Sequence, residues 1–324
     1  MNILVTGGAG FIGSHLVERL LGDGHAVTVL DDCSTGSEDN LATCRADPAL
    51  RFVRGSVLDE ALVADLVRAN RLVFHLAAAV GVPHVMRDPL WTILTNTRGT
   101  EFVLDRAADN GVRVVFASTS EIYGDSQDLP FREDGLRVLG PTWVHRWAYS
   151  TSKALDEHLC FAWAERGLSV SIVRYFNVYG TRMDPNGYGS VIARFIDQAL
   201  AGEPLTIHGD GDQSRCFTHV AEAVEATVRA GFRDEALGEA FNVGSPFEHT
   251  INDLAARVIA ASASASGTVR VPYRDAFGER FEDTRRRVPD VAKAERLLDW
   301  RATITLDQGL PAILAERRER SCAS

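Results

Sequence analysis

The sequence predicts an α/β fold in which a doubly wound parallel sheet is joined to a smaller, interleaved C-terminal domain. Short apolar runs alternate with helix-length segments through the first half of the chain, as βαβ units require. The runs are apolar at nearly every position, which is typical of strands buried on both faces. The six expected strands cover residues 2–6, 26–31, 51–54, 71–76, 112–117 and 169–174.

The alternation ends near residue 176, where longer loops, mixed helices and glycine-rich turns begin. We therefore expect a sheet domain over residues 1–175 and a second, partly interleaved domain over residues 176–316. The second domain should lie over the carboxyl ends of the strands, where doubly wound sheets bind their ligands. The polar C-terminal segment predicts a flexible tail over residues 317–324.

The charge balance argues against a polyanionic partner. The 324-residue chain has a formal net charge of −10, and its basic residues are scattered apart from short runs at 285–287 and 317–318. We therefore predict no nucleic-acid partner and no membrane partner. No apolar run approaches the roughly 18 residues of a membrane span. Met1 leads directly into the first strand without the basic region and cleavage site of a leader, which predicts a cytoplasmic protein.

The five cysteines are an odd number and show neither CxxC nor Cys/His metal spacing. We therefore expect no disulfide framework, no zinc site and no other metal. We interpret the five as packing residues: Cys33, Cys44, Cys160, Cys216 and Cys322.

The first strand leads into a glycine-rich turn, "TGGAGFIGSH" (residues 6–15). Gly7, Gly10 and Gly13 stand in GxxGxxG spacing between this strand and the amphipathic segment "SHLVERLL". Residues without a Cβ let backbone amides approach a pyrophosphate at a helix N-terminus. Strand, turn and helix together predict a Rossmann-like dinucleotide site. A tight turn without a ligand is the alternative.

The second expected strand ends in Asp31, some two dozen residues after the first glycine of the turn. A carboxylate there can accept hydrogen bonds from both ribose hydroxyls of an adenosine, and its charge repels a 2′-phosphate. The sequence therefore favours NAD over NADP as the cofactor. Asp32 either shares this role or is solvated, and a strand cap is the alternative for Asp31.

The fifth expected strand continues into three polar residues, Thr119, Ser120 and Glu121, within "VVFASTSEIYG". Two interpretations stay open. Glu121 starts a solvated turn, or a carboxylate is placed for chemistry at the carboxyl end of a buried strand.

A second motif, "YSTSK", places Tyr149 and Lys153 on one helix face because residues four apart are neighbours there. A nearby ammonium and a nicotinamide cation both favour the phenolate, so Tyr149 is a candidate proton acceptor. By spacing alone the pair also fits an exposed helix surface. The helix begins about 30 residues after Thr119, which should bring the pair to the same edge of the sheet.

In this order, the motifs resemble the extended short-chain dehydrogenase/reductase family, in its branch of nucleotide-sugar epimerases, dehydratases and decarboxylases. The resemblance covers essentially the whole chain and implies an NAD-dependent enzyme that oxidises a sugar transiently at C4. It is carried by "ILVTGGAGFIGSHL", "VFHLAA", "STSEIYG", "YSTSK", "VRYFNVYG", "GDGDQSRCFTHV" and "PDVAKAERLLDW".

The resemblance implies a catalytic triad of Thr119, Tyr149 and Lys153 around tightly held NAD. Relatives often carry an aspartate where Ser56 stands, so backbone groups are expected to contact the adenine here. The expected cofactor contacts are Gly7, Gly10, Phe11, Ile12, Gly13, Asp31, Asp32, Ser56, Val57, Leu76, Ala77, Ala78, Asn96, Tyr149 and Lys153.

The resemblance also implies residues that hold a nucleotide sugar, most simply a UDP-sugar. Asn177 is expected near the substrate phosphates, and Arg182 begins a segment (182–196) similar to the loop and helix that enclose the nucleotide in decarboxylases. Arg215 is expected to pair with the diphosphate, a role that suits a guanidinium fork. A surface ion pair is the alternative for Arg215.

The two residues after the triad hydroxyl distinguish activities within this branch. Dehydratases that eliminate the C6 hydroxyl carry Asp-Glu there, whereas this chain has Ser120 and Glu121. A serine cannot supply the acidic proton, and Ser-Glu is similar to UDP-glucuronate decarboxylases. Arg287 matches an arginine to which those enzymes give either an acid role or contact with the substrate carboxylate, although three adjacent arginines also fit a solvated run. The resemblance thus implies conversion of UDP-glucuronate to UDP-xylose or a 4-keto pentose.

Three other activities stay open. A UDP-hexose or UDP-hexuronate 4-epimerase shares the triad but usually carries a small or hydroxyl residue in place of Glu121, and a 4,6-dehydratase is the third choice. A dinucleotide-binding sensor typically lacks the Tyr or the Lys, both of which are present here. In relatives, helices equivalent to residues 89–111 and to the segment from Tyr149 pair across a two-fold axis. A homodimer is therefore implied, although packing within one chain gives the same pattern.

Overall fold

Seven parallel strands form the central sheet of the computed structural model, which describes residues 1–184, 191–278 and 283–323. The strand order is β11-β6-β5-β4-β1-β2-β3, so the chain switches direction across the sheet between β1 and β4. The predicted doubly wound sheet is confirmed, and all six expected strands are present within two residues of their expected ends. The strands are β1 (Asn2–Thr6), β2 (Ala26–Asp31), β3 (Leu50–Arg54), β4 (Leu72–His75), β5 (Arg113–Thr119), β6 (Val170–Tyr175) and β11 (Ala240–Val243).

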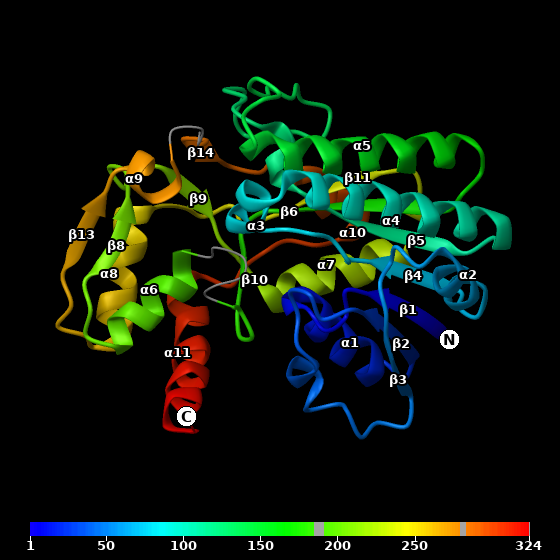
Figure 1. Ribbon diagram of the computed structural model, residues 1–324, viewed down its shortest axis with the longest axis horizontal. Helices are drawn as coiled ribbons and strands as arrows, with labels where there is room; N and C mark the ends of the chain where they lie inside the picture. The colour runs from blue at the N-terminus through cyan, green and yellow to red at the C-terminus, as the bar shows by residue number, and fades with distance from the viewer. Residues whose placement is uncertain (185–190, 279–282, 324) are drawn as a thin grey trace.

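Helices cover both faces of the sheet (Figure 1). Because successive side chains of a strand point to opposite faces, Ile3 and Val5 enter one core while Leu4 enters the other. The first core lies under α1 and α7, and the second lies under α2, α4 and α5. All three side chains are fully buried, which stabilises the fold by about 1.5–3 kcal/mol for each. The helices are α1 (Phe11–Gly22), α2 (Glu60–Arg68), α4 (Pro89–Asn110), α5 (Arg146–Glu165) and α7 (Val220–Phe232).

A second lobe lies beside the sheet domain, at the left of Figure 1. Its core is built from fully buried side chains that include Ile192, Phe195, Leu254, Val258 and Leu310. Its elements are α6 (Val191–Leu200), β8 (Leu205–His208), α8 (Ile251–Ser262), β13 (Thr268–Val271), α9 (Tyr273–Phe277) and α11 (Leu306–Ala323).

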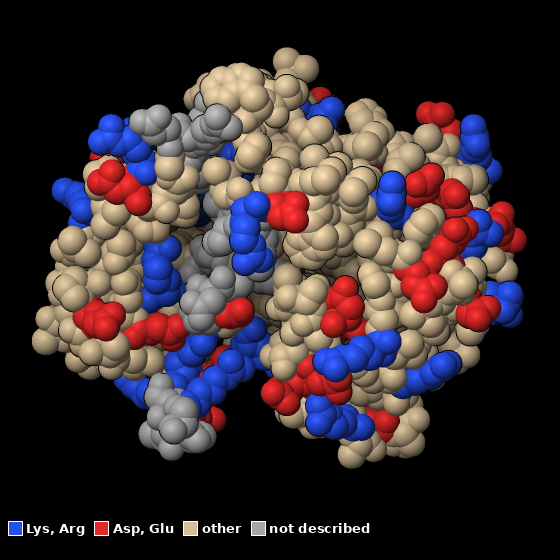
Figure 2. All heavy atoms as spheres, viewed as in Figure 1, with Lys and Arg blue, Asp and Glu red and all other residues tan. Residues whose placement is uncertain are grey.

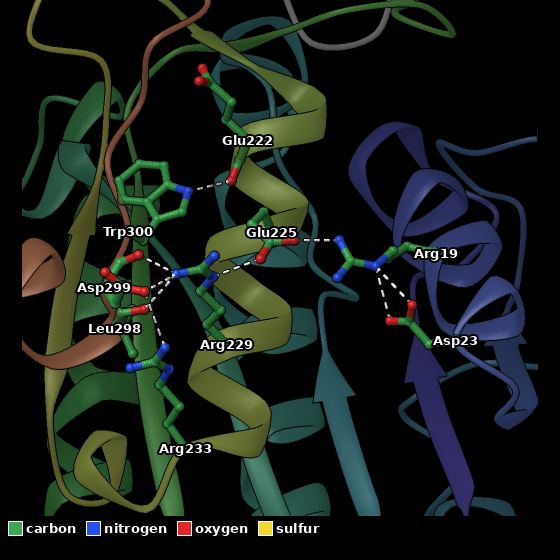
Figure 3. Close-up of polar contacts among 9 residues, drawn as sticks. All are labelled: Arg19, Asp23, Glu222, Glu225, Arg229, Arg233, Leu298, Asp299 and Trp300. Carbon is green, nitrogen blue, oxygen red and sulfur yellow. Dashed lines mark hydrogen bonds and ion pairs between the residues drawn. The ribbon is translucent and has the colours of Figure 1, made fainter.

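The two halves of the chain interleave deeply. Strand β11 and helices α7 and α10 (Ala292–Leu298) come after residue 176, yet all three pack in the sheet domain. Figure 3 shows how α7 is tied to its neighbours: Glu225 binds Arg19 of α1 and Arg229 of α7, and Arg229 reaches Asp299 just after α10. The indole of Trp300 donates to a carbonyl of α7 at 3.0 Å. These contacts anchor the C-terminal part of the chain on α7, and α7 on α1.

Several short elements lie outside the central sheet. In the register of β14 against β9, Arg287 lies opposite Arg215, so two arginines far apart in sequence become neighbours. The short elements are α3 (Val82–Arg87), the 3₁₀ turns Glu38–Leu41, Ser120–Tyr123 and Asp234–Ala236, and the strands β7 (Val178–Tyr179), β9 (Ser214–Cys216), β10 (Thr218–His219), β12 (Glu248–Thr250) and β14 (Arg286–Arg287).

The C-terminal segment differs from the prediction of a flexible tail over residues 317–324. Helix α11 continues to Ala323. Arg317 is buried, its guanidinium donates to the carbonyl of Met183, and it lies 3.7 Å from a carboxylate oxygen of Asp197. The polar composition of the segment therefore reflects the solvated side of a docked helix, and the tail prediction is wrong for residues 317–323.

Among the described residues, no helix is both long enough and apolar enough to cross a membrane. The thiols of Cys33, Cys44, Cys160 and Cys216 are free, and the last two are buried. The side chain of Cys322 lies outside the described residues.

Candidate active site

A cavity of about 440 Å³ lies at the carboxyl ends of the strands and extends toward the second lobe. Its walls come from the glycine turn after β1, the ends of β2, β4 and β5, the start of α5, and residues of β9 and β14. Figure 2 shows this face of the molecule notched between the two lobes, with Lys and Arg along the border of the notch. The position is the one at which doubly wound sheets bind ligands.

The glycine turn leaves no room for side chains. Gly7 has φ +72°, and a Cβ there would lie 2.7 Å from the amide nitrogen of Ala77. A Cβ on Gly13 would lie 2.1 Å from the carbonyl oxygen of Gly7. Helix α1 then starts after Gly10, which provides no side-chain cap, so the backbone N–H groups of its first turn face the cavity without a competing side chain. Such an N-terminus is suited to a pyrophosphate.

Asp31 ends β2 at the rim of the same cavity. Its two carboxylate oxygens accept backbone hydrogen bonds from Ala9 at 2.9 Å and Cys33 at 2.8 Å. Burial raises the pKa of Asp31, and these two bonds partly oppose the rise. Each oxygen keeps a lone pair, so the carboxylate can still accept bonds from two ribose hydroxyls. Asp32 also lines the cavity, with one oxygen accepting from the backbone of Ser34.

Two predicted cofactor contacts lie behind the cavity wall. Asn96 bonds both backbone groups of Ala79 and the hydroxyl of Ser152, so it shapes the loop after β4 without lining the cavity. Ser56 accepts a bond from the amide of Leu58, and it is also outside the lining. The remaining predicted cofactor contacts line the cavity: Gly7, Gly10, Phe11, Ile12, Gly13, Asp31, Asp32, Val57, Leu76, Ala77, Ala78, Tyr149 and Lys153.

The three residues of the predicted triad line the same cavity. Thr119 ends β5, and Tyr149 and Lys153 lie in the first turns of α5, so all three line the cavity. Lys153 is only 2% exposed, and its ammonium donates to the carbonyl of Ala117 at 2.9 Å. Burial lowers the pKa of Lys153. Ser120 follows Thr119 into the wall and is also buried. The expected gathering of strand end and helix at one edge of the sheet is therefore present.

Glu121 lies between two buried arginines. Its carboxylate pairs with the guanidinium of Arg146 on one oxygen and lies 3.4 Å from that of Arg287 on the other. Burial alone would raise the pKa of Glu121, but the two guanidinium groups together lower it to about 2. Burial, only partly offset by Glu121, lowers the pKa of Arg287 to about 10. Glu121 is therefore ionised at neutral pH, and it belongs to the cavity wall rather than to a solvated turn.

Arg146 lines the cavity, although the sequence motifs did not single it out as part of the site. It begins α5, three residues before Tyr149, and the 3.6-residue period of a helix puts both on the same face. Arg146 is only 5% exposed, and it lines the cavity. The three-residue spacing to Tyr149 is the signal that could have found it.

An ion pair between Arg215 and Asp283 also lies in the cavity wall. Arg215 lines the cavity and forms an ion pair with Asp283 at 2.8 Å. The other oxygen of Asp283 accepts a bond from the hydroxyl of Tyr273 at 3.0 Å. Arg215 is thus buried and paired within the site, rather than in a surface ion pair.

Of the two further residues predicted to bind the substrate, Asn177 lines the cavity and Arg182 does not. Asn177 lines the cavity with φ +38°, and its amide donates to the carbonyl of Cys216 at 3.3 Å. Arg182 is outside the lining, because its guanidinium binds Glu18 of α1 and its backbone N–H donates to Glu316. The structure therefore makes Arg182 a link between the lobes. Residues 185–190 of the expected nucleotide-enclosing segment lie outside the described residues.

The chain belongs to the NAD dependent epimerase/dehydratase family, whose model matches residues 3–244. The cofactor of that family fits the site, because the tight turn, which has no room for a Cβ at Gly7 or Gly13, leads into an uncapped helix start that lines the cavity. When bound, NAD would be held by the glycine turn, Asp31 and the loop after β4. The NAD prediction and the resemblance stated from the motifs are both confirmed.

Two curated relatives are decarboxylases. The chain is 40% identical to the UDP-N-acetyl-alpha-D-glucosaminuronate decarboxylase of Bacillus cytotoxicus, over 98% of this chain and 97% of the relative. It is 37% identical to the UDP-glucuronic acid decarboxylase 1 of Danio rerio, over 95% of this chain and 70% of the relative.

Solved structures of epimerases share the fold. The UDP-glucose 4-epimerase of Thermotoga maritima, solved with UDP-glucose, superimposes with a TM-score of 0.89 at 31% identity, covering 99% of this chain and all of that one. The UDP-glucuronic acid 4-epimerase of Bacillus cereus, solved with UDP-glucuronic acid and NAD, gives a TM-score of 0.88 at 28% identity, with the same coverage. The fold is thus shared across several reactions, and the site must distinguish among them.

Replacing Asp31 with asparagine is expected to lower the affinity for NAD by about 10- to 100-fold, because an amide has one acceptor oxygen and hydrogen bonds to a charged group contribute about 1.5–3 kcal/mol. Discrimination against NADP should weaken at the same time, since the charge that repels a 2′-phosphate is gone. Calorimetric titration of cofactor-stripped protein with both dinucleotides measures this. Unchanged affinity for both would contradict the role given to Asp31.

Replacing Glu121 with glutamine is expected to lower the free energy of unfolding by about 3 kcal/mol at pH 7, because two buried guanidinium groups lose their counter-charge. The folded-state pKa of Glu121, about 2, lies below its ordinary value of 4.5. Its stabilising contribution is therefore present above pH 4.5 and is lost as the pH falls toward 2. Urea unfolding of both proteins at pH 7, 4 and 3 checks this. A difference that stays constant over this range would rule out the ion cluster as its source.

Proposed function

We propose that this chain decarboxylates a UDP-hexuronate, namely UDP-glucuronate or its 2-acetamido counterpart, through transient oxidation of the sugar at C4. From UDP-glucuronate the product would be UDP-xylose if the reduced cofactor returned its hydride to C4, and the 4-keto pentose if the cofactor stayed reduced. The activities named for the Bacillus cytotoxicus and Danio rerio relatives support this reaction class.

One observation carries the proposal: the buried ion cluster of Glu121, Arg146 and Arg287 in the wall that also holds Tyr149. Its single carboxylate faces two guanidinium groups, so the cluster carries a net positive charge. A buried charge without a partner is costly, and a carboxylate on the substrate would balance it. A neutral hexose offers no such balance.

Oxidation at C4 uses the triad. Tyr149 removes the proton of the C4 hydroxyl, and the ammonium of Lys153, one helical turn away, favours the phenolate that this step requires. The hydroxyl of Thr119 holds the same sugar oxygen. Bound NAD supplies the hydride acceptor for this oxidation.

Carbon dioxide is lost from the oxidised sugar because a 4-ketone next to the C5 carboxylate is a β-keto acid. The bond from C5 to the carboxylate carbon breaks, and its electron pair moves into an enolate on the C4 oxygen. Tyr149, now protonated, donates a hydrogen bond to that oxygen. A proton must then return to C5. Glu121 cannot provide it at neutral pH because its pKa is about 2, so Arg287 or a water molecule that it holds is the donor.

Each alternative activity fits the residues of the cavity less well than decarboxylation. A 4,6-dehydratase needs an acid where Ser120 stands. A 4-epimerase needs no buried carboxylate at Glu121, and a sensor needs neither Tyr149 nor Lys153 in the cavity. The UDP-glucuronic acid 4-epimerase of Bacillus cereus remains the most instructive comparison, because its named substrate carries the same carboxylate.

We further propose that the protein is a homodimer formed through α4 and α5. Leu90 and Ile93 of α4 and Leu155 of α5 are exposed apolar side chains on helices that pack against each other. A second copy would bury them in a four-helix contact. The cytoplasmic location predicted from the sequence stays a prediction.

Product analysis of the NAD-loaded protein tests the function. It should release carbon dioxide from UDP-glucuronate, from the 2-acetamido uronate, or from both, and should leave UDP-glucose unchanged, as followed by ¹³C NMR of C6-labelled substrates. Formation of UDP-galacturonate without carbon dioxide would establish an epimerase. Inertness toward uronates with elimination from a neutral nucleotide hexose would establish a dehydratase.

A further inference from the structure

We propose that Arg146 is a specificity-determining residue that binds the carboxylate of the substrate together with Arg287. This inference rests on the proposed function and extends it, because it identifies which groups distinguish a uronate from a neutral hexose. Arg146 also holds Glu121, so the question is whether its guanidinium serves only that carboxylate or a second one as well.

The position of Arg146 on α5 places it beside the chemistry. Residues 146, 149 and 153 follow the i, i+3, i+7 pattern of one helix face, and all three line the cavity. The same helix therefore presents a guanidinium, a phenol and an ammonium to one ligand. Ser150, in the next turn, donates to the backbone carbonyl of Glu121, which fixes the strand end against the start of the helix.

Within the part of the chain that the structure describes, the charges around the cluster do not balance. Glu121 provides one negative charge for Arg146 and Arg287, while the neighbouring Arg215 is already neutralised by Asp283 at 2.8 Å. Counted over residues 1–184, 191–278 and 283–323, one positive charge is left at this wall.

The hydrogen bonds are also incomplete. Among the described residues, neither Nε of Arg146 nor Nε of Arg287 has a hydrogen-bond partner, although both atoms are buried. The bond from Arg287 to Glu121 is long, at 3.4 Å. Four other arginine Nε atoms are also buried without a hydrogen-bond partner among the described residues, but only these two belong to guanidinium groups that share one carboxylate in the cavity wall. An anion that enters between the two guanidinium groups would take up these donors and balance the charge, and modest side-chain rotation is enough for this.

A binding experiment on the NAD-loaded protein tests the role of Arg146. Tyr149→Phe serves as the background so that ligands bind without turnover, and calorimetry gives the affinities for UDP-glucuronate, UDP-glucose and UDP. Adding Arg146→Met should lower the affinity for UDP-glucuronate by about 10- to 100-fold, the range expected for hydrogen bonds to a charged group. Affinities for UDP-glucose and UDP should change by less than about threefold. Arg146→Lys should restore part of the uronate affinity, because it keeps the charge and loses the fork.

The matched control is Arg132→Met, which removes an exposed arginine that pairs with Asp134 outside the cavity and should change none of the three affinities. The inference would be overturned if Arg146→Met lowered the affinities for all three ligands equally, or if it left the affinity for UDP-glucuronate unchanged. If Arg146→Met does not fold, the Lys variant decides by the same ratio of affinities. If the wild type releases no carbon dioxide from any uronate while the selective loss is seen, the carboxylate subsite stands and only the decarboxylase proposal fails.

Discussion

Replacing Tyr149 with phenylalanine is expected to lower kcat by about 1,000-fold, within the range that positioned acid–base groups contribute. The variant loses the only phenol that shares the helix face of Lys153 in the cavity, so the C4 hydroxyl keeps its proton and oxidation does not begin. The glycine turn and Asp31 are untouched, so NAD should stay bound. Turnover by steady-state assay and the cofactor content of the purified variant measure the two effects.

Tyr123→Phe is the matched control. The hydroxyl of Tyr123 is buried but lies outside the cavity, where it bonds Asn242 and Arg174, both at 2.7 Å. Its loss should reduce stability by about 1 kcal/mol and leave kcat nearly unchanged. If Tyr149→Phe retained more than a tenth of the wild-type kcat, the tyrosine would not be the base.

Replacing Glu121 with glutamine is expected to separate oxidation from decarboxylation. Tyr149 and Lys153 remain, so UDP-glucuronate should still reduce the bound cofactor and produce absorbance at 340 nm. Carbon dioxide release should fall by about 100-fold or more, because Arg146 and Arg287 lose the carboxylate that orients them and the reacting group is no longer aligned. Stopped-flow absorbance and trapped carbon dioxide measure the two steps on one sample.

Two results would contradict this role of Glu121. Loss of the absorbance change together with carbon dioxide release would mean that Glu121 supports the oxidation step. Wild-type carbon dioxide release would mean that the ion cluster is structural. Asp156→Asn is not a suitable control, because Asp156 is buried beside Lys153. Asp134→Asn, at an exposed site, is suitable.

Local signals predicted the sheet and the cofactor end of the site well. Buried parallel strands are continuous apolar runs. The order of strand, glycine turn and helix over residues 2–22 is typical of a dinucleotide-binding site. The four-residue spacing of Tyr149 and Lys153 likewise follows from helix geometry alone. Because these features depend on residues that are close together in the sequence, they can be predicted from a single sequence.

The parts that escaped prediction depend on long-range contacts. Arg287 meets Glu121 only because β14 adds to β9, and no local pattern indicates that pairing. Arg182 turned away from the cavity because Glu18 of α1 is close enough to bind it. The terminal segment around Arg317 is helical because it docks on the second lobe, which its polar composition conceals.

A single-turnover quench experiment with UDP-glucuronate deuterated at C4 tests the central claim most directly. The claim is that carbon dioxide leaves only after the sugar has been oxidised by the cofactor beside Tyr149. We predict that deuterium appears on the nicotinamide before or together with carbon dioxide, and that Tyr149→Phe abolishes both. Release of carbon dioxide while the nicotinamide stays unlabelled at every time point would contradict the account.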